Sequence, residues 1–498
     1  MAITFELPDP AYEQYTWVYE NEHGPASQPP LMRGGAFGER PGGDGPPRRL
    51  VINGYGFFRS DPSGEMPMPF AVPDLAGASA LGRWREHWQP QVEALFEQLM
   101  AFDPRSVAPG AWQQSLKVQS DEFSRVFAGV HGESVVTSGR LADEFVTAYA
   151  AHFGEAQRAD ALALLQGFEN RTLDRALALW DLSRTVREDV ALRAALEGGE
   201  RPSEGEFAED FAAFLDEFGY TIDTGVADAP TWLEDPAPAI ALVLRYAAQS
   251  DDAGPGPAAE AQRARRQELE AALGAAAAKD EAAAALLRQL PAAQELLPVR
   301  EDHNTICDQR LSAASRFRWL RVGEHLVERG LVADPSEVFY HELPELYRAL
   351  DEGVPVAPAT LAERTALQSQ YRAALPPPFL GQPLAGAGER TEVVGTAASP
   401  GQYRGRARVI RALAEADRLA DGEVLVCGVT QPTWTPYFAL AGAVVTDAGG
   451  ALSHTAVVAR EYGIPAVVGT RTGTREIPDG ALVLVDGSAG TVAIIAEG

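Results

Sequence analysis

The chain has 498 residues, more than one hydrophobic core usually organises, which predicts two or three domains. Its 70 acidic and 42 basic side chains give a formal net charge of −28, which would repel a nucleic-acid backbone, and no stripe rich in Lys and Arg opposes it. Hydrophobic residues make up 46% of the chain, and no apolar run approaches the roughly 18 residues that a membrane span requires. We therefore expect a soluble globular protein that neither binds nucleic acid nor crosses a membrane.

The first residues and the cysteines bear on location and redox state. The N-terminus, MAITFELPDPAYEQYTW, carries acidic residues where a secretory signal would carry a basic segment, so we expect a cytoplasmic protein. Cys307 and Cys427 are far apart in the sequence and belong to no CxxC pair. They indicate neither a disulfide framework nor a zinc site, and we expect both to be reduced and buried.

Composition divides the chain into three parts. Residues 1–76 are rich in Pro and Gly, which predicts extended segments that pack on the rest of the chain through aromatic residues such as Trp17. In residues 77–387 apolar residues recur at three- and four-residue spacing, which predicts a mostly α-helical domain. Short β-rich runs separated by Gly, Pro and Asp fill residues 388–498 and predict a small α/β domain with a mixed β-sheet. The run LPPPFLGQPLAGAGERT is typical of a linker between these two domains.

One stretch of the α/β domain, GAVVTDAGGALSHTAVVAREYGIPAVVGT at residues 442–470, has the order strand, tight turn, helix. The pair Gly449–Gly450 allows the turn, Ser453 is placed to cap the helix, and Gly463 is placed to end it. His454 therefore falls in the first helical turn. Free backbone N–H groups and the positive end of the helix dipole favour a phosphoryl group there.

An imidazole suits the transfer of a phosphoryl group because an unprotonated ring nitrogen is available as a nucleophile near neutral pH. A lone His at a helix start is usually structural, so the assignment of His454 depends on the surrounding motif. The groups expected to bind the phosphoryl oxygens are the hydroxyls and the glycine turn around His454, namely Thr446, Gly449, Gly450, Ser453 and Thr455.

The same stretch resembles the phosphohistidine signature of phosphoenolpyruvate-utilising enzymes, which include phosphoenolpyruvate synthase, pyruvate phosphate dikinase and rifampin phosphotransferase. Residues 395–409 and 423–447 resemble the rest of that domain. The resemblance implies that residues 388–498 form a swivelling domain in which His454 takes up a phosphoryl group at one site and delivers it at another. Arg460 and Glu461 belong to the signature too, and a simple ion pair at the helix end is the alternative interpretation.

The order of a helical region followed by the histidine domain is similar to rifampin phosphotransferase without its nucleotide-binding domain. Residues 164–184, 214–236 and 299–346 resemble segments of the acceptor-binding domain, with Tyr220 standing where a His is expected. The ATP-grasp-type module that phosphorylates the histidine in this family is not recognisable in the sequence, and no acidic cluster suggests a metal site. We therefore expect ATP and Mg²⁺ to be bound by a separate ATP-grasp-type subunit.

The four ionisable residues 300–303 are the leading candidates for the acceptor site. Such clusters are often solvated helix starts. An acceptor site, however, requires a carboxylate or His to deprotonate the acceptor hydroxyl and an Arg beside it to neutralise the incoming phosphate. Arg300, Asp302 and His303 are therefore predicted to act with His454 in catalysis. The further candidates for binding the acceptor are Glu301, the pair His341 and Glu342, and His23, which falls where the N-terminal segment of the family lines the acceptor pocket. The remaining histidines, His87, His131, His152 and His325, are expected to be structural or exposed.

Two functions remain open at this point. In the first, the chain is a dikinase-type phosphotransferase component that moves a phosphoryl group from ATP, through His454, to a hydroxyl of a small molecule held in the helical domain. If that hydroxyl lies β to a carbonyl, phosphate elimination would make the net reaction a dehydration. In the second, the chain is a non-catalytic small-molecule-binding or regulatory protein descended from such an enzyme. The intact histidine signature favours the first hypothesis.

Overall fold

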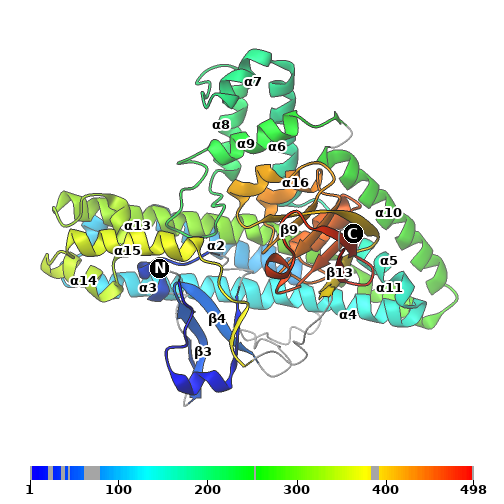
Figure 1. Ribbon diagram of the computed structural model, residues 1–498, viewed down its shortest axis with the longest axis horizontal. Helices are drawn as coiled ribbons and strands as arrows, with labels where there is room; N and C mark the ends of the chain where they lie inside the picture. Colours follow the sequence, from blue (N-terminus) through cyan, green and yellow to red (C-terminus); the bar gives the residue numbers. More distant parts are fainter. Residues whose placement is uncertain are drawn as a thin grey trace.

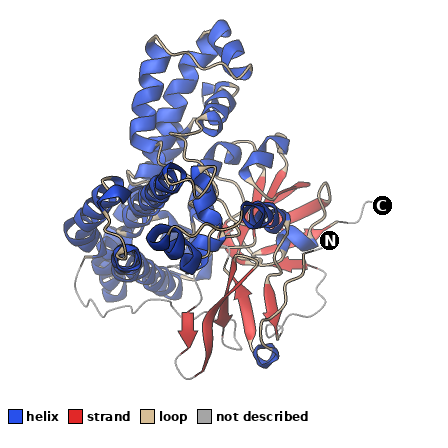
Figure 2. Cartoon of the chain, turned by 90° about the vertical axis from the view of Figure 1, so that its left-hand side faces the viewer, coloured by secondary structure: helices blue, strands red, loops and turns tan. Residues whose placement is uncertain are grey.

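The computed structural model describes residues 3–20, 26–34, 40–42, 45–60, 79–251, 254–382 and 392–495. A small antiparallel sheet near the N-terminus and a larger mixed sheet near the C-terminus lie on the same side of a helical body, and one group of helices projects from that body (Figures 1 and 2). The predicted fold class, a mostly helical domain followed by a small α/β domain, is confirmed. The proposed boundary at residue 388 lies outside the described residues.

The helical body consists of helices that range from one turn to more than six turns in length. They are α1 (Ala80–Arg83), α2 (Gln89–Met100), α3 (Trp112–Gly129), α4 (Val136–Phe153), α5 (Arg158–Ala163), α6 (Arg171–Glu188), α7 (Val190–Glu197), α8 (Glu206–Phe218), α9 (Ala237–Ala247), α10 (Pro255–Ala277), α11 (Glu281–Gln294), α12 (Leu296–His303), α13 (Arg310–Glu328), α14 (Leu343–Glu352) and α15 (Pro358–Ala373). Three π-helical segments interrupt these runs: η3 (Trp84–Trp88), η5 (Val130–Val135) and η8 (Asn304–Gln309).

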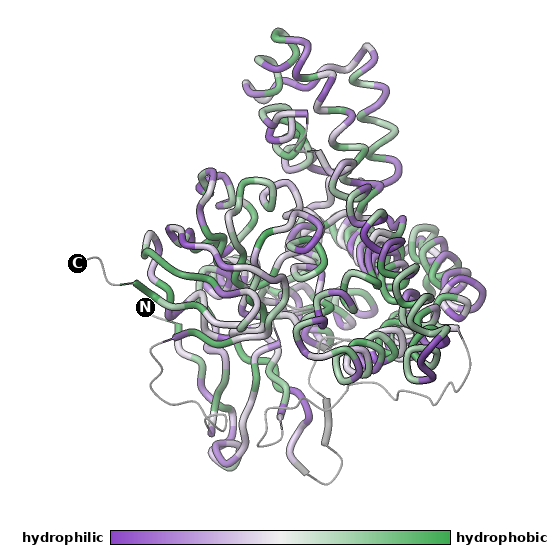
Figure 3. Tube along the Cα trace, turned by 90° about the vertical axis from the view of Figure 1, so that its right-hand side faces the viewer, coloured by the Kyte–Doolittle hydropathy of each residue, from purple (hydrophilic) through white to green (hydrophobic). Residues whose placement is uncertain are grey.

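The projecting helices are α6 to α9 (Figures 1 and 2). Their amphipathic pattern explains how they pack, because α8 buries Phe207, Phe211, Phe214 and Phe218, spaced four, three and four residues apart along one helix face. In Figure 3 the hydropathy colouring accordingly changes between hydrophobic and hydrophilic along these helices.

The N-terminal sheet has the strands β1 (Thr16–Tyr19), β2 (Arg40–Gly42), β3 (Gly45–Ile52), β4 (Tyr55–Ser60) and β5 (Phe379–Gly381), in the order β2-β3-β4-β1-β5. All neighbours are antiparallel, and Trp17 and Phe57 are fully buried in its core. β5 comes from the part of the chain that we expected to be helical. Its residue Leu380 pairs with Trp17, so the chain beyond the helical body returns to complete the N-terminal sheet.

The C-terminal sheet has the strands β6 (Glu392–Val394), β7 (Thr396–Ser399), β8 (Gln402–Ile410), β9 (Val424–Cys427), β10 (Ala443–Thr446), β11 (Ala466–Val468), β12 (Leu482–Asp486) and β13 (Thr491–Ile494), in the order β6-β13-β12-β8-β9-β10-β11-β7. β8 to β11 are parallel in the centre, and the outer pairs are antiparallel. β9, β10 and β11 are buried along their whole length, which explains their continuous apolar sequences. The short helices of this domain are α16 (Thr435–Phe438), α17 (His454–Glu461) and α18 (Gly473–Glu476).

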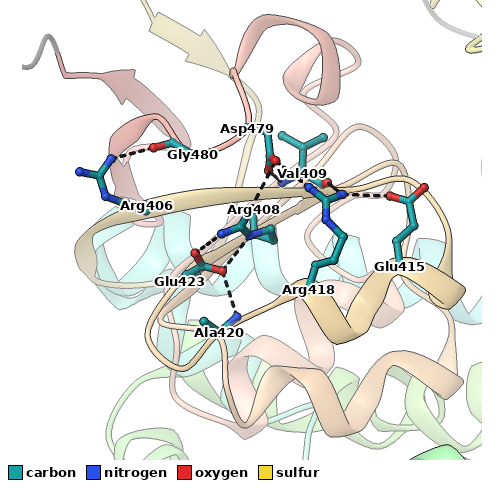
Figure 4. Close-up of polar contacts among 9 residues, drawn as sticks. All are labelled: Arg406, Arg408, Val409, Glu415, Arg418, Ala420, Glu423, Asp479 and Gly480. Carbon is teal, nitrogen blue, oxygen red and sulfur yellow. Dashed lines mark hydrogen bonds and ion pairs between the residues drawn. The ribbon is translucent and has the colours of Figure 1, made fainter.

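A charged network holds one side of this domain together (Figure 4). Arg408 on β8 pairs with Glu423 at 2.6 Å and with Asp479 at 3.4 Å. Asp479 also pairs with Arg418 at 2.6 Å and accepts a hydrogen bond from the backbone N–H of Val409 at 2.9 Å. The network ties β8 to the turn before β9 and to the turn before β12, so the domain that carries His454 has its own internal framework.

The C-terminal domain packs directly on the helical body. A single hydrophobic cluster contains Leu242 and Tyr246 of α9 together with Phe438 and Val458 of the C-terminal domain. Gln262 of α10 donates a hydrogen bond to the backbone carbonyl of Arg460 at 2.8 Å, which adds a polar contact beside α17.

Cys307 and Cys427 are buried free thiols, as predicted. Among the described residues, none of the helices combines the length and the apolar character that crossing a bilayer would need.

Candidate functional site

The strand, turn and helix predicted around His454 are confirmed. β10 ends at Thr446, Gly449 has φ +103°, and α17 begins at His454 with Ser453 as its N-cap. The Ser453 hydroxyl accepts a hydrogen bond from the backbone N–H of Ala456 at 3.4 Å. The helix ends where predicted, because Gly463 follows with φ +67°.

The glycine turn is tight because its backbone lies against neighbouring groups. A Cβ atom on Gly449 would lie 2.8 Å from the Ser453 hydroxyl, and one on Gly469 would lie 2.6 Å from the carbonyl oxygen of Gly449. Glycine is therefore needed both for conformation and for space at these two positions. Gly450 has open space around it.

His454 meets the helical body at Glu301. Its Nδ1 atom lies 3.4 Å from Oε2 of Glu301, and the two side chains are only 14% and 5% exposed. The hydroxyl of Thr172, on α6, donates to the same Oε2 atom at 2.6 Å. Burial alone would raise the pKa of Glu301, but the positive charge and hydrogen bonding of His454, with Thr172 and Arg300, outweigh it and hold this pKa at about 2. Glu301, which we expected to bind the acceptor, thus holds the histidine instead.

Both ring nitrogens of His454 are buried in this arrangement. Phosphorylation of Nε2 adds a bulky group with negative charge, which needs space and solvent or cationic partners. In this arrangement the unmodified ring is docked on Glu301, and neither of its nitrogens is open to solvent.

A second carboxyl group, Glu461, lies at the end of α17. Burial and, to a lesser extent, the negative charge of Glu301 raise its pKa to about 8, while Arg460 opposes the shift. A cavity of about 20 Å³, enough for a single water molecule, is lined by both Glu301 and Glu461. The site thus holds one carboxyl group that is ionised and one that is largely neutral near pH 7.

The other signature residues have structural contacts in this state. Arg460 donates to the carbonyl oxygens of Ala398 at 2.5 Å and Ala451 at 2.8 Å, so it ties the loop before His454 to β7. The Thr446 hydroxyl donates to the carbonyl of Ala448 at 2.8 Å, and the Thr455 hydroxyl lies 2.8 Å from that of Thr430. A bound phosphoryl group would compete with these contacts for the two threonine hydroxyls.

A cavity of about 1380 Å³ lies between the helical body, the N-terminal sheet and the C-terminal domain. Its wall includes aromatic side chains such as Phe58, Trp232 and Trp434, and the Gly449 turn next to His454. Six arginines reach it, although the chain as a whole is strongly acidic: Arg49, Arg300, Arg372, Arg411, Arg471 and Arg475. The cavity is large enough for a drug-sized molecule that combines apolar and anionic groups.

The four residues 300–303 separate in the structure. Arg300 lines the large cavity and Glu301 faces His454. Asp302 accepts a hydrogen bond from the backbone N–H of Arg171 at 3.1 Å, at the start of α6, and His303 is buried beside Asp308. The four side chains therefore do not converge on one pocket, because consecutive helical residues point in different directions.

The remaining candidates lie elsewhere or outside the described part of the chain. His341 is fully buried, with Nδ1 3.0 Å from the carbonyl oxygen of Glu337, and Glu342 caps α14. His23 lies outside the described residues. Tyr220, where a His was expected, packs edge-on against Phe96 with ring centroids 5.1 Å apart.

Sequence reasoning missed two groups of residues. Asp223 lines the large cavity, its Oδ2 accepts a hydrogen bond from the Trp232 indole at 3.2 Å, and burial raises its pKa. His131 and His303 both approach Asp308, with Nε2–oxygen distances of 3.6 Å and 3.5 Å. His131 lies more than 170 residues before His303 and Asp308 in the sequence, so no local motif could have joined it to them.

Comparison with known proteins agrees with this architecture. A family model described as PEP-utilising enzyme, mobile domain, matches residues 419–490, which include His454. A model described as rifampicin phosphotransferase fourth domain matches residues 131–301, which extend from His131 to Glu301. The interdomain contact between His454 and Glu301 thus joins the two matched regions.

Three relatives show the extent of the similarity. Chondramide synthase of Chondromyces crocatus is 34% identical over 500 residues, covering 89% of this chain and 13% of that protein. The uncharacterized phosphotransferase YvkC of Bacillus subtilis is 30% identical, covering 69% of this chain and 44% of that protein. A rifampicin phosphotransferase of Streptomyces sviceus is 31% identical, covering 78% of this chain and 46% of that protein. This chain spans less than half the length of each of these relatives, and two of them are named phosphotransferases. The two matched regions and these relatives show that the chain carries a region of the PEP-utilising mobile-domain family and a region of the rifampicin phosphotransferase fourth-domain family, and that it is similar to the rifampicin phosphotransferases.

Proposed function

We propose that this protein is a phosphotransferase component in which His454 carries a phosphoryl group to a hydroxyl of a small molecule in the large cavity. The observation that carries the proposal is the docking of His454, at the N-terminus of α17, onto the buried carboxylate of Glu301 beside that cavity. ATP is the proposed source of the phosphoryl group. A separate ATP-grasp-type subunit would bind ATP with Mg²⁺.

The loading step uses the ring nitrogen that Glu301 does not face. In the docked state the carboxylate at Nδ1 favours the tautomer that carries its proton there. Once His454 has left Glu301, Nε2 acts as the nucleophile through its lone pair. At the loading site a bond forms between Nε2 and the β-phosphorus of ATP as the bond to the AMP oxygen breaks. Water then releases the γ-phosphoryl group as phosphate. Movement of the C-terminal domain away from Glu301 must precede this step, since Nε2 is buried in the docked state.

In the delivery step the acceptor oxygen forms a bond to phosphorus as the N–P bond breaks, and the hydroxyl proton passes to a base. We assign the base to Asp223 rather than to Asp302, because Asp223 lines the cavity and Asp302 caps a helix. Burial raises the pKa of Asp223, which suits a proton acceptor. Its Oδ1 atom is buried and has no hydrogen-bond partner among the described residues.

Arg300 and Arg175 would supply positive charge during delivery. Arg300 lines the cavity, and the fully buried Arg175 interacts electrostatically with both Glu301 and Asp223. Burial lowers the pKa of Arg175 to about 10, while these two carboxylates oppose the shift. Arg175 therefore links the histidine site to the base. If the acceptor carries its hydroxyl β to a carbonyl, the phosphorylated product is a substrate for elimination, and the net reaction is a dehydration.

The direct test is transfer of label from ATP to His454. The protein would be incubated with Mg²⁺, β-³²P-labelled ATP and the nucleotide-binding domain of a rifampicin phosphotransferase supplied in trans. We expect an acid-labile, base-stable phosphoprotein that is lost in His454→Gln and kept in His152→Gln, whose site on α4 pairs with Asp280. Label that persists in His454→Gln would contradict the proposal. Absence of label in the wild type would favour the non-catalytic binding protein.

A further inference from the structure

Three side chains of the helical body meet at one point outside the His454 site. His131 lies in the π-helical segment η5, His303 ends α12, and Asp308 lies in the π-helical segment η8. Nε2 of His131 is 3.6 Å from Oδ1 of Asp308, and Nε2 of His303 is 3.5 Å from Oδ2 of the same carboxylate. Both histidines are buried, and Asp308 is 21% exposed.

The backbone determines which ring nitrogen of each histidine carries the proton. Nδ1 of His131 lies 2.8 Å from the carbonyl oxygen of Phe127, and Nδ1 of His303 lies 3.1 Å from that of Val299. A carbonyl oxygen can only accept a hydrogen bond, so each Nδ1 is the protonated nitrogen. In the neutral rings both Nε2 atoms then carry lone pairs. Each of them faces a carboxylate that also has only lone pairs to offer.

Three groups that can only accept hydrogen bonds repel one another unless a cation lies among them. Proteins commonly orient a metal-binding imidazole in this way, with its Nδ1–H donating to a carbonyl oxygen and its Nε2 facing the metal ion. We propose that His131, His303 and Asp308 bind one divalent transition-metal ion, of which Zn²⁺ is the best match. This inference does not depend on the proposed phosphotransfer.

The donor set selects the class of metal. Two imidazole nitrogens and one carboxylate suit Zn²⁺ and similar late first-row ions, whereas Mg²⁺ and Ca²⁺ prefer oxygen ligands. Ligands about 2.0–2.2 Å from a tetrahedral ion are roughly 3.3–3.5 Å apart. The observed nitrogen–oxygen separations of 3.5 Å and 3.6 Å are close to that spacing and are too long for direct hydrogen bonds.

The position of the site suggests what the ion would do. His131 also lines the large cavity, as does Arg300, three residues before His303. A site with three protein ligands keeps an open position, as catalytic zinc sites do. An oxygen atom of a molecule in the cavity would fill it. The two π-helical segments, each carrying one ligand, are of the kind often found at functional sites.

The expectation from sequence was that the chain has no metal site. No acidic cluster marks these residues, and His131 and His303 stand in separate helices. Because the proposed site rests on side chains brought together only by folding, composition and spacing could not have indicated it.

The experiment measures metal binding directly. The full chain would be dialysed against EDTA, returned to metal-free buffer and titrated with ZnCl₂ by calorimetry, with Co²⁺ absorption as a spectroscopic readout. We expect one Zn²⁺ per chain, bound with a dissociation constant on the order of micromolar or tighter, and a Co²⁺ spectrum typical of tetrahedral or five-coordinate nitrogen and oxygen ligands. Mg²⁺ at millimolar concentration should not compete.

Variants identify the ligands. His303→Ala should weaken Zn²⁺ binding by more than ~100-fold, because losing a residue that only orients a ligand already costs ~10–100-fold. Asp308→Asn keeps the shape of the side chain and should have a similar effect, so it serves if His303→Ala does not fold. His152→Ala, at a surface histidine paired with Asp280, should leave the affinity unchanged. The proposal is overturned if the wild type binds no Zn²⁺, which is the result expected if both imidazoles around Asp308 are protonated. It is also overturned if the folded variants His303→Ala and Asp308→Asn bind Zn²⁺ with the full affinity of the wild type.

Discussion

Nδ1 of His454 and Oε2 of Glu301 lie 3.4 Å apart across the boundary between the C-terminal domain and the helical body. The contact orients the imidazole of the C-terminal domain against a buried carboxylate of the helical body.

Replacing Glu301 with Gln should slow phosphoryl transfer without unfolding the protein. The amide keeps the size of the side chain and can still accept from Thr172, but it presents no charge to His454. We expect single-turnover phosphoryl transfer to be about 10²-fold slower, because misplacing a reacting group by a small distance typically costs about that factor in rate. Glu209→Gln, at an exposed position on α8, is the matched control. Rates within a factor of about two of the wild type would show that Glu301 does not orient the histidine.

Replacing Glu461 with Gln should change how stability depends on pH. The pKa of Glu461 is raised to about 8 in the folded protein, against about 4.3 in an unfolded chain. The folded state therefore keeps a proton that the unfolded state loses. The stability associated with this proton is complete below about pH 4.3 and is lost as pH rises through about 8.

Calorimetric melting temperatures should show this effect. Gln cannot ionise, so Glu461→Gln should gain stability relative to the wild type between pH 5 and pH 9, with the largest gain at the alkaline end. Glu476→Gln, at an exposed site on α18, should give a curve parallel to that of the wild type. Parallel curves for Glu461→Gln as well would mean that the carboxyl group is already ionised in the docked state.

The two adjacent glycines before His454 should differ in their tolerance of alanine. Gly449 has φ +103° and would place a Cβ atom 2.8 Å from Ser453, the N-cap of α17. Gly449→Ala should therefore destabilise the protein by about 1–3 kcal/mol in urea unfolding. Gly450→Ala meets open space and should cost less than about 1 kcal/mol. Equal losses at the two positions would contradict the assignment of the strained turn to Gly449.

Replacing Leu452 with Ser should loosen the docking of the C-terminal domain. Leu452 precedes α17 and packs against a cluster of the helical body that includes Phe145 and Leu286. Losing this apolar contact should weaken docking by about 1 kcal/mol, which increases the undocked population roughly fivefold. Hydrogen exchange at the α17 amides should accelerate accordingly. Val394→Ser, at an exposed site on β6, should leave that exchange unchanged.

The sequence by itself determined the local chemistry of His454. A glycine pair, a serine cap and a closing glycine act over a few residues, through backbone conformation and hydrogen bonds to near neighbours. The strand before Gly449, the first helical turn at His454 and the end at Gly463 were therefore predictable. The alternation of helical and strand periodicity likewise predicted the fold class.

Only the tertiary structure decided what these parts meet. The run of residues 300–303 looked like one cluster, but the helix sends Glu301 to His454, Asp302 to the start of α6 and His303 to Asp308. β5, which follows the helical body in the sequence, pairs with β1 of the N-terminal sheet. His131, from a distant helical segment, packs against His303. These contacts depend on how whole helices and strands pack, which is set by the sum of many buried surfaces rather than by any short run of residues.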